Sequence, residues 1–151
     1  MREIPIRDLA PGIVPGLSVV MPGDAPYRET YFEWTAAPLA ASFQTKEISG
    51  GTLRAWKSVP CFSQIETHVD AEMFYFLEGT AIMLFGEMKG GAPDDGSLQI
   101  VRIPAGTRIV IPKGKAHFVP VAADDTPVSV VVVGPRMEAP RQALKEPVLG
   151  V

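Results

Sequence analysis

The sequence predicts an all-β protein, a barrel or sandwich of short strands. Its 15 prolines and 14 glycines are spread along the whole chain and divide it into many short segments. Several of these segments alternate apolar and polar residues, or are short apolar runs bounded by turn residues, and both patterns are typical of strands. Outside the C-terminal tail, no helical periodicity is sustained over ten residues. We therefore expect a fold made of strands and tight turns.

The length and composition favour a single domain. A chain of 151 residues, 46% hydrophobic and 21% charged, is long enough to bury a core and too short for two complete domains. We expect an N-terminal arm over residues 1–26, a barrel over 27–134 and a C-terminal tail over 135–151.

The predicted arm is rich in proline and glycine, with short apolar pieces that predict one or two short strands. Such an arm covers an open edge of a barrel, packs on a neighbouring subunit, or stays loosely ordered. Residues 27–35 and 40–48 are then predicted strands, and a turn follows at 49–51.

The middle and the second half of the chain continue the strand pattern. Residues 52–59 predict a strand that Pro60 ends, 61–79 a strand pair or one long bent strand, and 80–85 a short buried strand. Glycines and aspartates in 89–97 predict a loop. Further strands are expected at 98–103, 107–111, 116–121 and 128–133. The tail contains three prolines, and we expect a turn of helix around 141–145.

One stretch places polar side chains inside an apolar, strand-like run. Gln64, Glu66, His68 and Glu72 share one parity, so in an extended chain they face the same side, which two phenylalanines continue. Burying a carboxylate without a partner costs on the order of several kcal/mol. This face therefore predicts either a bound cation or a wet, functional cavity.

Charge and cysteine content exclude some partners. The net charge is −3, and no cluster of lysine and arginine alternates with aromatic residues, which argues against a nucleic-acid partner. The single cysteine, Cys61, cannot form an internal disulfide, as is usual in a reducing compartment. No apolar stretch has the length of a signal peptide core or a membrane span. We expect a cytoplasmic protein without a membrane partner.

Two spacings carry a family resemblance. The first is Glu66-x-His68-x3-Glu72-x6-Gly79, and the second is Gly106-x5-Pro112-x-Gly114-x2-His117. They resemble the two signature motifs of the cupin superfamily in order, separation and strand context, over about a third of the chain. The resemblance implies a single-domain cupin double-stranded β-helix, a jelly-roll barrel with an N-terminal arm.

The sequence departs from the usual cupin pattern at three positions. Glu66 stands where the first histidine normally lies, Pro60 replaces the glycine before it, and Val121 replaces the final asparagine of the second motif. The second half, residues 97–121, is also similar to the corresponding segment of ureidoglycolate lyases.

The resemblance implies a metal site. Glu66, His68, Glu72 and His117 match the ligand positions, and a mixed set of imidazoles and carboxylates suits Fe(II), Mn(II), Ni(II) or Zn(II). The role of Glu66 stays open between a metal ligand, a catalytic base beside the metal, and a rim carboxylate bonded to a basic side chain.

Three other residues are candidates for binding substrate. Gln64 can reach the mouth of the barrel, Tyr75 can line a pocket or an interface, and Arg54 can hold a substrate carboxylate. Each is also an ordinary surface or strand residue.

Three functions fit these residues. The first is a metal-dependent lyase, hydrolase or isomerase acting on a small polar carboxylate, as ureidoglycolate lyases do; the second is a non-haem iron dioxygenase. The third is a non-catalytic barrel that binds a small molecule. We also expect a homodimer, since small cupin barrels commonly pair through N-terminal strands and a sheet face.

Overall fold

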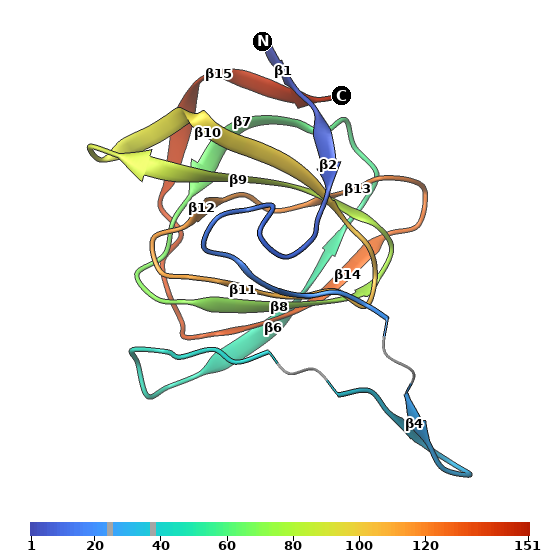
Figure 1. Cartoon of the computed structure of the whole chain (residues 1–151). Coiled ribbons are helices and arrows are strands. Elements are labelled where there is room, and N and C mark those ends of the chain that lie inside the picture. Colours follow the sequence, from blue (N-terminus) through green and yellow to red (C-terminus); the bar gives the residue numbers. More distant parts are fainter. Residues whose placement is uncertain (24–25, 37–38) are drawn as a thin grey trace.

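Two β-sheets face each other across the interior of the protein, and every regular element among the described residues is a strand (Figure 1). The computed structural model describes residues 1–23, 26–36 and 39–151. Residues 24–25, in the predicted arm, and 37–38, between two predicted strands, lie outside the described residues. Within the described part of the chain, no helix is long and apolar enough to cross a membrane.

The larger sheet, sheet A, has the strand order β1-β15-β7-β12-β9-β10-β2, with β13 also paired to β9. Its strands are β1 (Arg2–Ile4), β2 (Ile6–Asp8), β7 (Cys61–Glu66), β9 (Ala81–Lys89), β10 (Ala92–Ile103), β12 (Ala116–His117), β13 (Val121–Ala122) and β15 (Arg141–Gly150).

The smaller sheet, sheet B, has the order β3-β11-β8-β14-β6. Its strands are β3 (Ser18–Val20), β6 (Ser49–Ala55), β8 (Glu72–Glu78), β11 (Arg108–Ile111) and β14 (Val128–Gly134). A separate hairpin joins β4 (Tyr27–Arg28) to β5 (Glu33–Trp34).

The chain crosses repeatedly between the two sheets. It runs from β7 in sheet A to β8 in sheet B, back to β9 and β10, then to β11, to β12 and β13, to β14, and finally to β15. Most pairs are antiparallel and join strands far apart in the sequence, as β14 with β6 and β8. This is the topology of a jelly roll, and it confirms the predicted all-β fold.

The space between the sheets holds the first of two cores, which we call the inner core. Alternate residues of strands from both sheets point into it, as the period of a strand requires. Its largest members are Phe74, Phe76, Met83, Phe85, Ile103, Ile109 and Ile111, all buried.

A second core lies on the other face of sheet A, and all of its buried residues come from that sheet. They are Phe62, Ile65, Ile82, Leu84, Leu98, Ile100, Ala116, Leu144 and Val148. The sheet can enclose this core because it curls on itself. The parallel pairs of β1 with β15 and of β2 with β10 join its two ends, and only Pro5 separates β1 from β2.

The N-terminal segment therefore covers sheet edges, which is one of the three expectations for the arm. β3 adds to the edge of sheet B beside β11. The N- and C-terminal strands β1 and β15 lie side by side (Figure 1).

Several local expectations are wrong. Residues 141–145 form the start of strand β15 rather than a helical turn, because they pair with β7 from Arg141 onward. The predicted loop 89–97 is a hairpin that turns at Gly90 and Gly91, and most of it belongs to β10. Residues 27–35 give two short strands in place of one, residues 40–48 contain no strand, and residues 49–51 belong to β6 rather than to a turn.

Gly79, the last residue of the first motif, is required by the turn between β8 and β9. Its φ is +72°, and a Cβ atom there would lie 2.5 Å from the carbonyl oxygen of Pro127 and 3.1 Å from that of Thr126. Any side chain would therefore meet both a left-handed backbone and rigid backbone atoms.

We predict that Gly79→Ala is much more destabilising than Gly90→Ala. Gly90 has a φ of +60°, but a Cβ atom there would have no neighbour within 4 Å, so its substitution costs only the left-handed conformation, roughly 1 kcal/mol. Gly79→Ala adds a backbone clash and should lower the free energy of unfolding by about 2 kcal/mol more. Urea unfolding of the two variants measures the difference, and equal losses would contradict the prediction.

Candidate metal centre

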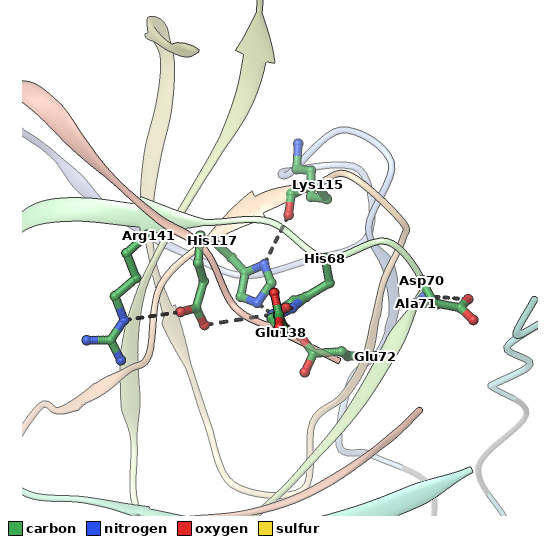
Figure 2. A network of polar contacts seen from close by, with 9 residues as sticks. His68, Asp70, Ala71, Glu72, Lys115, His117, Glu138 and Arg141 are labelled. Atoms are coloured by element: carbon green, nitrogen blue, oxygen red, sulfur yellow. Dashed lines mark hydrogen bonds and ion pairs between the residues drawn. The ribbon is translucent and has the colours of Figure 1, made fainter. Parts of the chain in front are cut away.

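Four ionisable side chains meet in the interior where the two sheets approach each other (Figure 2). Glu66 ends β7 and His117 ends β12, and these two residues are register partners in sheet A. Glu72 begins β8 in sheet B, and His68 lies in the loop between β7 and β8. The structure thus brings together all four residues that the motifs predict as metal ligands.

The four side chains are almost fully buried. Their exposed fractions are 2% for His117, 8% for His68, 9% for Glu66 and 15% for Glu72. The rings of Phe74 and Phe85 lie 6.3 and 6.5 Å from the His117 ring, centroid to centroid. The imidazole of His117 is therefore held in a largely apolar wall.

The ligand-type atoms converge on one point. The Oε2 atom of Glu72 lies 3.1 Å from the Nε2 atom of His68 and 3.1 Å from the Nε2 atom of His117. The Oε1 atom of Glu66 lies 3.8 Å from the Nε2 atom of His68. Glu66, His68 and His117 each offer an atom within 4.8 Å of the others, a spacing that a single metal ion can span.

Both imidazoles have their other ring nitrogen occupied. The Nδ1 atom of His117 lies 3.0 Å from the carbonyl oxygen of Lys115, and that of His68 lies 3.0 Å from the carbonyl oxygen of Glu138. Because a carbonyl can only accept a hydrogen bond, each Nδ1 carries the proton and donates it. In the neutral ring, each Nε2 atom is then left with its lone pair directed at the cluster, which is how metal-binding histidines are commonly oriented.

Two buried atoms of the cluster lack a hydrogen bond. The Oε2 atom of Glu72 and the Nε2 atom of His117 face each other, yet neither has a hydrogen-bond partner among the described residues. Buried polar atoms without partners are rare and call for a ligand, an ion or a functional role. The donor set therefore fits a metal ion.

The second carboxylate of the cluster has a basic partner. The Oε2 atom of Glu66 lies 3.6 Å from the Nε atom of Arg141, whose guanidinium group also stacks 5.2 Å from the ring centre of Phe118. β15 brings Arg141 opposite Glu66 in sheet A. One oxygen of Glu66 thus faces the imidazoles while the other faces a guanidinium.

The charges of the cluster are strongly coupled. Burial would raise the pKa of Glu72, but the close approach of His117 and His68 outweighs it and lowers that pKa to about 2. The nearby Glu72 carboxylate raises the pKa of His68, against the opposing effect of burial. The cluster without metal therefore favours an ionised carboxylate beside a cationic imidazole.

The three predicted substrate-binding residues are not joined to the cluster by any hydrogen bond or ion pair among the described residues. Gln64 is half-buried on β7, two residues before Glu66 and so on the same face of the strand. Tyr75 lies on the outer face of sheet B, with the guanidinium of Arg108 5.9 Å from its ring centre. Arg54 is exposed on β6.

Sequence reasoning missed the residues that support the ligands. The carbonyl groups of Lys115 and Glu138 carry no side-chain signal, and Arg141 lies in the stretch expected to be helical. Asp70 could have been noticed, since it stands between two predicted ligands. Its buried carboxylate accepts hydrogen bonds from the backbone N–H groups of Gln44, Thr45 and Ala71.

We predict that the stabilising effect of Glu72 depends on pH in the metal-free protein. Its pKa is lowered from 4.5 to about 2, so its contribution is present above pH 4.5 and is lost as the pH falls toward 2. The pKa of His68 is raised, so its contribution is present below 6.5 and is lost as the pH rises through the raised value. The free energy of unfolding of wild type should exceed that of Glu72→Gln most between pH 4.5 and 6.5, by up to about 3 kcal/mol.

Urea unfolding in EDTA at pH 3, 5.5 and 8 tests this expectation. Glu78→Gln, an exposed carboxylate at the other end of β8, serves as the control and should show little change with pH. A difference between wild type and Glu72→Gln that stays constant over the three pH values would contradict the coupling.

No protein-family model matches the sequence, and no curated protein matches it. Among solved structures, similar chains include oxalate decarboxylase of Bacillus subtilis from a study of its Mn(II) centres, with 16% identity and a TM-score of 0.46. The structure of the same enzyme at pH 4.6 has 16% identity to this chain and a TM-score of 0.46. A mutant of that enzyme has 16% identity and a TM-score of 0.47. The first match covers 64% of this chain and 24% of the oxalate decarboxylase chain, so this chain spans about a quarter of the length of that protein.

Proposed function

We propose that this protein is a metal-dependent enzyme of the cupin type that acts on a small polar carboxylate. The observation that carries the proposal is the position of one carboxylate oxygen, Oε2 of Glu72, 3.1 Å from each of two imidazole Nε2 atoms in a buried site. Both Nδ1 protons are already donated to carbonyl groups. Such an arrangement orients the lone pairs before any ion arrives.

The donor separations support a cation in the centre of the cluster. Two donors about 2.1 Å from one ion and at right angles to each other stand roughly 3 Å apart. The separations of 3.1 Å from Glu72 to each imidazole match that value. His68, Glu72 and His117 would hold the ion, with Glu66 as a fourth ligand or a neighbouring base.

The donor types narrow the choice of metal ion. Imidazole nitrogen and carboxylate oxygen suit Mn(II), Fe(II), Zn(II) and Ni(II). A second carboxylate adds negative charge and hardness, which favours Mn(II), Fe(II) or Zn(II) over copper.

The chemistry follows from the metal and from Glu66. When bound, a divalent cation polarises a carbonyl, carboxylate or hydroxyl oxygen of the substrate. Glu66 keeps one oxygen toward the imidazoles and the other toward Arg141, so it can hold or move a proton next to the reacting atoms. Lyase, hydrolase or isomerase reactions on a small acid need these two functions, and ureidoglycolate lyase-like chemistry is one example.

A non-haem iron dioxygenase is the second candidate. Two histidines and one carboxylate, here His68, His117 and Glu72, are the donor set of many Fe(II) oxygenases. Turnover of small acids under anaerobic conditions would exclude this candidate, whereas Fe(II)-dependent oxygen uptake would favour it over the first.

We predict that the protein purified without added metal contains a transition metal, or takes up about one equivalent of Mn(II) or Fe(II) on titration. His117→Ala removes a ligand with a buried Nε2 and should weaken this binding by ~100-fold or more. Glu78→Gln is the matched control and should bind metal as wild type does. Elemental analysis and calorimetric titration provide the measurement. Failure of wild type to bind any divalent metal would leave only a non-catalytic binding barrel.

We predict that Glu66→Gln separates the two roles of Glu66. If Glu66 moves a proton, the variant keeps its metal, and its turnover of the small carboxylate substrate falls by at least ~100-fold. If Glu66 is a ligand, the variant loses metal affinity in the titration. Unchanged affinity together with unchanged turnover would assign Glu66 to neither role.

A further inference from the structure

A pocket of about 890 Å³ lies beside the loop that carries His68, and it is lined by residues 44–49, 69–70 and 135–137. We call it the mouth pocket. Two segments of its lining are close in sequence to the metal centre. Val69 and Asp70 lie between His68 and Glu72. Residues 135–137 directly precede Glu138, whose carbonyl orients His68. None of the four cluster residues lines it.

One wall of the mouth pocket is fixed by a buried carboxylate. Residues 44–48 form no regular structure, yet the Asp70 carboxylate accepts hydrogen bonds of 2.9 Å from Gln44 N and 3.0 Å from Thr45 N. It also accepts a hydrogen bond of 2.8 Å from Ala71 N. Figure 2 shows Asp70 and Ala71 to the right of the two imidazoles. Asp70 is only 5% exposed, so the wall is attached to the ligand-bearing loop before any molecule enters.

Two cationic side chains of the mouth pocket can contact an anion. Lys46 and Arg136 line it, and neither forms an ion pair with any residue that the structure describes. The lining also holds two acidic side chains, Glu47 and Asp70, and the Asp70 carboxylate is turned toward the backbone N–H groups of Gln44 and Thr45. Arginine and lysine together are well suited to a carboxylate, which arginine can bind through two hydrogen bonds.

Part of the remaining lining is apolar and can contact an apolar body, beside the polar residues Gln44, Thr45 and Ser49. Ile48 and Val69 are 45% and 73% exposed, and Met137 lies near them in the lining. A volume of about 890 Å³ also exceeds what a two-carbon acid would fill.

We propose that the mouth pocket recognises the substrate of the metal centre, and that this small carboxylate joins its polar, metal-binding group to a short apolar body. Arg136 and Lys46 contact the carboxylate, and Ile48, Val69 and Met137 contact the body. This inference rests on the proposed function for the metal centre and specifies its substrate class.

Binding of hexanoate, followed by NMR of the metal-free protein, tests the pocket by itself. Wild type should bind hexanoate more tightly than acetate, which lacks the body, and than hexanol, which lacks the charge. The double variant Arg136→Gln/Lys46→Gln should weaken hexanoate binding by about tenfold or more. Lys89→Gln, an exposed lysine outside the pocket, is the control and should bind as wild type does. Equal binding to the double variant and to wild type would overturn the proposal.

A second measurement tests the link to the metal centre. With Mn(II) bound, the protons of hexanoate in the mouth pocket should relax faster in wild type than in the double variant, since the pocket adjoins the cluster. Both proteins should bind Mn(II) equally, because neither substituted residue belongs to the cluster. Hexanoate that binds through Arg136 and Lys46 but shows no Mn(II) effect would overturn the assignment to substrate recognition. Failure of wild type to bind Mn(II), Fe(II), Zn(II) or Ni(II) would instead reject the proposed function, while the metal-free comparison still decides whether the pocket binds carboxylates.

Discussion

The Glu72 carboxylate between two imidazoles is the interaction on which the interior of this protein depends. Its Oε2 atom lies 3.1 Å from both Nε2 atoms and has no hydrogen bond of its own among the described residues. A buried, ionised carboxylate oxygen without a hydrogen bond needs positive charge beside it, from a protonated imidazole or from a metal ion. Glu72 belongs to sheet B and His117 to sheet A, so the same charge balance that forms the site also joins the two sheets across their apolar interior.

The two cores explain how the ligands are held in place. On β7, Ile65 packs in the second core while its neighbour Glu66 faces the cluster. On β12, Ala116 packs in the second core while its neighbour His117 faces the cluster. A strand places adjacent residues on opposite faces, so Glu66 and His117 are each fixed by the burial of the residue before them. The second core, enclosed by the curled sheet A, thereby positions residues of the cluster from the opposite face of the sheet.

The meeting of the four cluster residues could be predicted from the sequence because their signals are local. The common parity of Glu66, His68 and Glu72, and the turn ahead of His117, fix each side chain relative to its own strand. The supporting partners could not, because they arise from pairing between distant strands. Arg141 meets Glu66 only through the pairing of β15 with β7, and local pattern, which predicts a helical turn there, does not reveal that pairing. In the predicted loop 89–97, the pairing of β10 with β9 outweighs the preference of the turn-forming residues.

The position of β15 in the chain has a consequence for how the site matures. All four ionisable residues of the cluster are synthesised before the Glu138 carbonyl that orients His68 and the Arg141 guanidinium that faces Glu66. A nascent chain on the ribosome thus carries the four cluster side chains before His68 and Glu66 have these partners. In the proposed metal centre, the ligands would be fully oriented only after β15 has docked against β7.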